Sequence, residues 1–335
     1  MYLSLPLKAA EKKARAPGAV LLGLLRGGTL PEGALKRWSE VVALAEAHRV
    51  GPLLHSTARE LPGEARESLQ QMRAAALADR GWQHAALLRV QGALEGAGAL
   101  ALHAAAHAED LYPAPELRPH RTLDLLIAPS RTFAALERLS RRGYQIDPTL
   151  SKPDKGWLTL RLRDPRDARV VIDLHRGFPP LPGVPPRGDA EVRSALDAEQ
   201  LCRRAAGTRL EANDAVVVQA LALAAAEFRA PLIWVADLAH LLRRGEMKAL
   251  LARAHQVSLM PQLAAALALL ARCAGSARRL GGAPVESGRL PRLEVPKELA
   301  RAVDRFELEI AERPGPFAQV ARALRRAVAG RGGVE

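Results

Sequence analysis

Apolar residues recur three and four positions apart through the N-terminal part of the chain, which is the spacing of an amphipathic helix. Trp38, Val41, Val42, Leu44 and Ala45 form one such set, and a second long run of helix-forming residues covers 63–94. These patterns predict a helical N-terminal segment, residues 1–95.

The pattern changes in the middle of the chain, where short apolar or alternating runs are typical of strands. We expect strands at 99–102, 122–127, 157–163 and 169–175, with a helix at 132–142. Ser130 suits the start of that helix and Gly143 its end. The polar turn at 164–167 joins the last two strands, so residues 157–175 predict a β-hairpin.

From residue 189 the chain again has the pattern of helices, which we expect at 214–229, 231–244, 247–256 and 261–274. A stretch rich in Gly, Pro and Arg, residues 275–296, reads as a linker before one or two terminal helices. The prediction is an α+β fold with a small mixed β-sheet between helical segments. Its expected parts are residues 1–95, 96–188, 189–275 and 276–335.

Composition narrows the class of protein. The chain is 48% hydrophobic and 25% charged, which is typical of a globular protein. Its longest apolar runs, 216–228 and 263–271, are too short for a membrane span. Lys8 to Arg15 precede a short apolar stretch without a signal-peptide cleavage site, so we expect a cytoplasmic protein and no membrane partner.

The net charge of +13 raises the question of nucleic acid. Only eight of the 49 basic residues are lysine, and aromatic residues make up 4% of the chain. Scattered arginines with few aromatics are typical of a GC-rich genome rather than of a stacking surface for bases. We therefore do not expect nucleic acid as the partner.

Two acidic residues of the predicted strands are candidate ligands for catalytic metal ions. Strand residues two apart share one face, so paired carboxylates with a third on a neighbouring strand can hold two Mg²⁺ ions. Asp124 and Asp173 are the candidates, but Thr122 stands two residues before Asp124, which leaves this set one carboxylate short. Alternatively, Asp173 pairs with an arginine of the hairpin, and Asp124 pairs with Arg118 or Arg121.

Five segments, taken in order, resemble a known family. In order along the chain they are 45–53, 111–127, Gly143-Tyr144, Asp173-Leu174-His175 and 232–239. The second of them, 111–127, contains a Tyr-Pro pair, an Arg-Pro pair and the run Leu-Asp-Leu-Leu-Ile. Together, over roughly residues 20–275, they resemble the uncharacterised nucleotidyltransferase family of the polymerase-beta-like superfamily.

The resemblance implies a function and a set of site residues. Asp124 and Asp173 correspond to catalytic metal ligands, and Arg118 and His175 to other motif residues. Thr122 stands where the family has its first metal-binding aspartate. His103-Ala104 stands where it usually has Lys-Gly, whose glycine lets a phosphate approach the backbone. The residues expected to contact the nucleotide are thus His103, Ala104, Arg118, Thr122 and His175.

The family reaction transfers a nucleotidyl group from a nucleoside triphosphate to an acceptor, which the sequence does not name. Because two elements of the motif are replaced, we expect weak or lost Mg²⁺ binding and weakened or lost transfer, as in a pseudoenzyme. The alternatives are a non-catalytic binding or scaffold protein that keeps the fold and, less favoured, a basic nucleic-acid-binding protein.

Overall fold

The computed structural model describes residues 16–147, 159–167, 169–181, 184–188, 193–285, 290–291 and 293–312. The expected strand residues 157–158, the basic residues 8–15 and any helix after residue 312 lie outside these ranges. By contacts the chain forms two compact units. One comprises Met1–Ala75, Ala226–Ala239 and Ala264–Glu335, and the other comprises Ala76–Ala225 and His240–Leu263.

Helices make up most of the described chain. The N-terminal ones are α2 (Pro17–Leu25), α3 (Trp38–Ala47), α4 (Gly51–Thr57) and α5 (Gly63–Ala93). The central ones are α6 (His103–Asp110) and α7 (Thr132–Arg141). The later ones are α8 (Ala198–Arg204), α9 (Ala212–Ala225), α10 (Leu232–Leu241), α11 (Met247–Gln256), α12 (Met260–Ala274) and α13 (Lys297–Glu312). Short 3₁₀ turns lie at Ala34–Arg37, Pro115–Leu117, Pro129–Arg131 and Gly275–Ala277. Among the described residues, no helix combines the length and the apolar character that crossing a bilayer requires.

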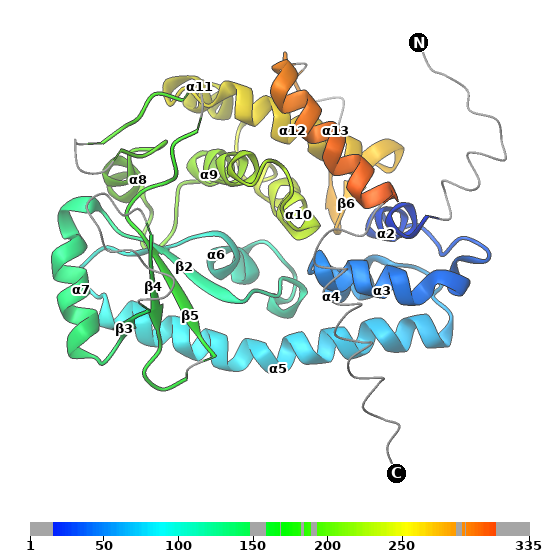
Figure 1. The fold of residues 1–335 in the computed structure, drawn as a ribbon, viewed down its shortest axis with the longest axis horizontal. Helices are drawn as coiled ribbons and strands as arrows, with labels where there is room; N and C mark the ends of the chain where they lie inside the picture. The colour runs from blue at the N-terminus through cyan, green and yellow to red at the C-terminus, as the bar shows by residue number, and fades with distance from the viewer. Residues whose placement is uncertain are drawn as a thin grey trace. The chain divides into compact units, whose positions relative to one another are not determined.

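A mixed five-stranded sheet lies in the second unit (Figure 1). Its strands are β1 (Leu100–Ala101), β2 (Thr122–Leu126), β3 (Gln145–Ile146), β4 (Thr159–Arg163) and β5 (Val171–His175). The order is β1-β2-β5-β4-β3; β2 and β5 are parallel, and the other pairs are antiparallel. The predicted α+β fold with a small mixed sheet is confirmed.

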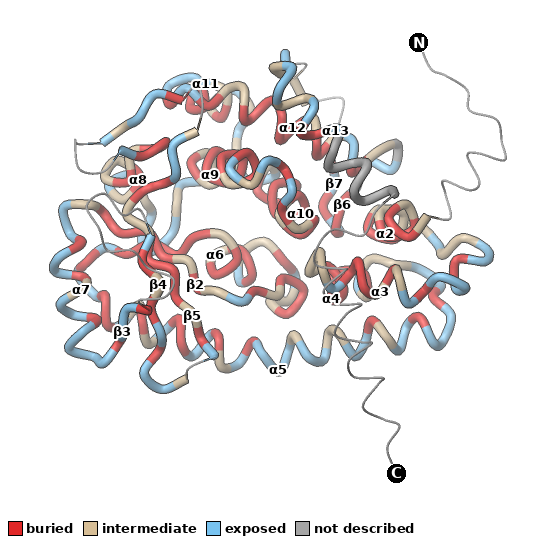
Figure 2. Tube along the Cα trace, viewed as in Figure 1, coloured by how far each residue is buried: buried red, intermediate tan, exposed pale blue. Residues whose placement is uncertain are grey.

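One face of this sheet is packed against two helices. Leucines and isoleucines alternate along the strands, which directs every second side chain to the same face. They form a core with residues of α5 and α7, and this core appears as buried segments in Figure 2. Its main members are Leu87, Val90, Leu123, Leu125, Leu139, Leu162, Ile172 and Leu174. The opposite face of β2, β5 and β4 is therefore the one that carries polar side chains.

The turn between β4 and β5 fixes the register of the polar face. The Asp164 side chain accepts hydrogen bonds from the backbone N–H groups of Arg166 and Asp167, at 2.8 and 3.2 Å. An aspartate that bonds the backbone two residues on stabilises a tight turn. The predicted hairpin is thus confirmed, with Arg161 directly opposite Asp173.

The segment predicted to be a linker contains ordered structure. Strands β6 (Arg279–Leu280) and β7 (Ala283–Pro284) form a hairpin, with Leu280 and Ala283 fully buried. Gly281 and Gly282 both have positive φ, +57° and +84°, as a type I′ turn requires. The linker prediction was wrong here, because this Gly-Gly pair is a hairpin turn rather than a flexible stretch.

Candidate functional site

Strands β2 and β5 bring the two predicted carboxylates together. Asp124 is the register partner of Asp173 in this parallel pair. Register partners on neighbouring strands project to the same face, so both side chains lie on the polar face of the sheet. Their side chains are 17% and 11% exposed, which leaves each carboxylate only a small opening to solvent.

Asp124 is bonded on both carboxylate oxygens. Its Oδ1 lies 3.2 Å from Nε2 of His175, and its Oδ2 accepts a hydrogen bond from the Thr122 hydroxyl at 3.1 Å. Burial by itself would raise the pKa of Asp124. The hydrogen bond and charge of His175, the charge that His103 carries below its own pKa of about 4, and the Thr122 hydroxyl outweigh that effect and lower the pKa of Asp124 to about 2. Asp124 is therefore ionised at neutral pH.

His175 is held between two side chains. An ionised carboxylate only accepts hydrogen bonds, so Nε2 of His175 is the donor to Oδ1 of Asp124. The other ring nitrogen, Nδ1, is 2.9 Å from the hydroxyl of Thr159 on β4. The ring is thereby oriented toward Asp124.

Asp173 is bonded by a guanidinium. Nε and Nη2 of Arg161 donate to its two carboxylate oxygens at 2.6 and 2.7 Å. The hydrogen bond to Asp173 is the largest cause of a raised pKa of Arg161, so the guanidinium keeps its positive charge beside this carboxylate. Of the alternatives that the sequence left open, the pairing of Asp173 with a hairpin arginine is the one that the structure contains.

The start of α6 is fixed beside Asp124. The backbone N–H of Leu102 donates to the carbonyl oxygen of Asp124 at 2.8 Å, and α6 begins at the next residue, His103. His103 has a φ of +45°, a conformation that favours glycine. Its neighbour Ala104, predicted to replace the family's glycine, has an ordinary backbone and is buried. The conformation that favours glycine thus falls on His103 rather than on Ala104.

Burial controls the charge of His103. It lowers the pKa of His103 to about 4, although the charge of Asp124 acts in the opposite direction. The ring is neutral at pH 7, and its Nδ1 is 3.4 Å from Oε1 of Gln219. His103 therefore supplies a hydrogen-bonding group but no positive charge where the family usually has a lysine.

Arg118 is buried in the loop that precedes β2. It is 1% exposed, and its Nη1 donates to the carbonyl oxygen of Pro119 at 3.0 Å. A buried guanidinium bonded to the backbone stabilises the local loop. Its predicted contact with a nucleotide stays a prediction.

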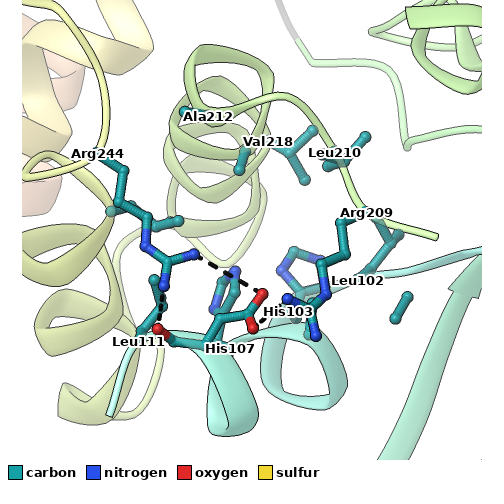
Figure 3. Close-up of a pocket in the computed structure, with 14 residues that line it drawn as sticks. Leu102, His103, His107, Leu111, Arg209, Leu210, Ala212, Val218 and Arg244 are labelled. Atoms are coloured by element: carbon teal, nitrogen blue, oxygen red, sulfur yellow. Dashed lines mark hydrogen bonds and ion pairs between the residues drawn. The ribbon is translucent and has the colours of Figure 1, made fainter. Parts of the chain in front are cut away.

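A pocket of about 160 Å³ lies along α6, within the second unit, and its lining includes Leu102 and His103 at the start of the helix (Figure 3). Its walls are largely apolar, from residues such as Leu102, Leu111, Leu210, Val218 and Leu241. The polar groups of its lining are His103, His107, Asp110, Arg209 and Arg244.

Two arginines meet one acid in this pocket. Arg209 forms an ion pair with Asp110, and Arg244 both pairs with that carboxylate and donates to the Asp110 carbonyl. In Figure 3, Arg209 and Arg244 converge from different segments above the histidines of α6. Two guanidinium groups against one carboxylate leave a net positive charge. Neither Arg209 nor Arg244 was predicted as a site residue from the sequence.

The polar face does not fit the magnesium ions that the family resemblance implies. Mg²⁺ needs anionic oxygen ligands in near-octahedral geometry. Across the ranges described above, no group of three or more His, Cys, Asp or Glu side chains is arranged to hold a metal ion. Of the two carboxylates present, Asp173 has both oxygens bonded by Arg161 and Asp124 has both bonded by His175 and Thr122.

Comparison with known proteins agrees with this fold. The model of the uncharacterised nucleotidyltransferase family matches residues 35–275, and the chain belongs to that family. No curated protein matches the chain.

Proposed function

We propose that the protein is a nucleotide-binding member of the nucleotidyltransferase family in which metal-dependent nucleotidyl transfer is weak or absent. The observation that carries this proposal is the composition of the polar sheet face. Where a two-metal clamp needs three carboxylates, this face has Asp124, Asp173 and the neutral Thr122.

The missing carboxylate bears directly on the reaction. A two-metal site stabilises both the attacking and the leaving oxygen of the transfer, and anionic ligands hold both ions. A hydroxyl at position 122 cannot balance the charge of a dication, and in this structure it donates to Asp124 instead. Loss of even an outer-shell partner typically lowers metal affinity about 10- to 100-fold. Loss of a direct ligand should lower it further.

The pocket beside α6 supports retained binding of a nucleotide. The lining combines apolar walls with a few convergent polar groups, as small-molecule sites do, but its volume of about 160 Å³ would hold only part of a nucleotide. The net positive charge from Arg209, Arg244 and Asp110 favours an anionic ligand such as a phosphorylated nucleotide. His103 lines the same pocket and lies next in the chain to Leu102, which bonds Asp124. A nucleotide bound in this pocket would lie next to Asp124 and the incomplete set of carboxylates on the polar sheet face.

A calorimetric titration tests the binding. ATP, GTP, CTP and UTP are titrated into the protein with Mg²⁺ and with EDTA. We expect at least one nucleotide to bind with the same affinity in both conditions. Binding that appears only with Mg²⁺, and that Asp124→Ala abolishes, would contradict the proposal.

A matched pair of variants tests the location. Arg244→Ala removes a pocket cation, whereas Arg243→Ala removes the same charge from an exposed neighbour outside the pocket lining. We expect Arg244→Ala to weaken binding several-fold and Arg243→Ala to leave it unchanged. Equal effects of the two variants would place the ligand elsewhere.

A further inference from the structure

Arg161 binds the carboxylate oxygens of Asp173 that a metal ion would need. It lies on β4, directly across the antiparallel β4–β5 pair from Asp173. Its Nε and Nη2 engage one carboxylate oxygen each, at 2.6 and 2.7 Å. The Asp173 side chain is 11% exposed and that of Arg161 is 32% exposed, so the guanidinium is the more exposed partner of the pair.

In this pair, the positive charge that balances the Asp173 carboxylate belongs to the protein itself. The planar guanidinium matches a carboxylate with two parallel hydrogen bonds and does not lose its proton at physiological pH. A divalent ion that bound Asp173 would have to displace both bonds and leave Arg161 near a second positive charge. Such a competitor is always present, because it is part of the same hairpin.

We infer that Arg161 is an intrinsic counter-cation that excludes divalent metal ions from this face, and that removal of its charge opens a divalent-cation site. The ligands of that site would be the carboxylates of Asp173 and Asp124, with the Thr122 hydroxyl beside them. This inference deepens the proposed function and rests on it for its biological meaning.

A second ion pair on the same strand offers a matched control. Nε and Nη2 of Arg163 donate to Oδ2 of Asp147 at 3.1 and 2.8 Å. Arg163 faces Val171 across the β4–β5 pair, so the register gives it no carboxylate partner on β5. Arg163→Met therefore removes the same charge, from the same strand, without freeing Asp173.

The test is a titration with Mn²⁺ alone, followed by the electron paramagnetic resonance of the free ion and by calorimetry. Wild type, Arg161→Met, Arg163→Met and the double variant Arg161→Met/Asp173→Asn are compared at pH 7.5. We expect Arg161→Met to bind one Mn²⁺ about 10- to 100-fold more tightly than wild type. Arg163→Met should match wild type, and Asp173→Asn should abolish the gain.

Three results would overturn the inference. They are wild-type binding as tight as that of Arg161→Met, an equal gain in Arg163→Met, and a gain that survives Asp173→Asn. If Arg161→Met does not fold by circular dichroism, Arg161→Gln replaces it. Glutamine removes the charge and the two-bond fork but keeps a polar end at this partly exposed position, so we expect Mn²⁺ affinity above that of wild type; wild-type affinity in Arg161→Gln would count against the inference. Because the titration contains no nucleotide, its outcome is independent of whether the protein binds or transfers one.

Discussion

Arg161 and Asp173 face each other across the β4–β5 hairpin and share two hydrogen bonds, of 2.6 and 2.7 Å. One partner of this pair is a residue that the family resemblance assigns to a metal ion. The pair therefore links the stability of the hairpin to the proposed weakening of metal binding, and both effects can be measured.

The stability of this pair is measurable by a double-mutant cycle. We expect Arg161→Met to lower the free energy of unfolding more than Asp173→Asn does, because Asp173 is the more buried partner. The coupling energy should be about 1–3 kcal/mol in urea unfolding monitored by circular dichroism. A coupling near zero would show that the ion pair does not form in solution.

A third carboxylate on the polar face should repel the other two. Thr122→Asp replaces a hydroxyl that lies 3.1 Å from Oδ2 of Asp124. We expect it to lower the free energy of unfolding by about 1–3 kcal/mol without metal, since like charges are crowded in a partly buried site. Thr122→Asn, of the same shape but neutral, should cost less. Equal losses in the two variants would exclude charge repulsion as the cause.

His120 should make folding sensitive to acid. Burial, reinforced by the charges of Arg118 and Arg80, lowers the pKa of His120 to about 4, against 6.5 for an exposed histidine. Both of its ring nitrogens are buried. Between pH 6.5 and 4 the unfolded chain binds a proton that the folded chain does not, so stability falls as the pH falls.

The variant His120→Leu isolates this contribution. Removal of the ring should reduce the loss of stability between pH 7 and pH 5 by about 1–2 kcal/mol. Urea unfolding at several pH values measures it. His48 and His103, whose pKa values burial also lowers to about 4, remain in the variant and keep part of the acid sensitivity. An unchanged pH dependence in His120→Leu would contradict the burial of this neutral ring.

Alanine substitutions at the two glycines of the β6–β7 turn should destabilise the protein to different extents. A Cβ at Gly281 would lie 2.7 Å from Cδ2 of Leu53 and 3.1 Å from Cβ of Ala236, whereas at Gly282 the nearest atom is 3.9 Å away. Both positions have positive φ, so each alanine variant pays about 1–2 kcal/mol for the left-handed backbone. We expect Gly281→Ala to cost about 1 kcal/mol more than Gly282→Ala, because it also overpacks the core. Equal melting temperatures for the two variants would show that the turn is not packed as described.

Much of the site geometry follows from local sequence. Alternating apolar residues on 122–126 and 171–175 predict two strands with a buried face, and this pattern directs Asp124 and Asp173 to the other face. Arg161 was foreseen only as one of several hairpin arginines. Its partner becomes definite only when the turn at Asp164 sets the register, because a shift by one residue would direct it to the opposite face.

The pocket beside α6 could not be predicted from the sequence. Arg209 and Arg244 lie 99 and 134 residues from Asp110 along the chain, so no local pattern joins them. The Gly-Gly turn of β6–β7, in contrast, was visible in the sequence. Its surroundings, rich in Gly, Pro and Arg, made it read as a linker, although two adjacent glycines also suit a tight hairpin turn.

The most direct test of the central claim is pyrophosphate release from a nucleoside triphosphate in excess Mg²⁺, measured for wild type and Asp124→Ala. Nucleotidyl transfer releases pyrophosphate with any acceptor, including water, so the assay does not require the natural acceptor to be known. If Arg161 and Thr122 have replaced the metal chemistry of this face, both proteins should release pyrophosphate at the same background rate. Release by wild type that requires Mg²⁺, and that Asp124→Ala abolishes, would show that the site is a working metal-dependent transferase.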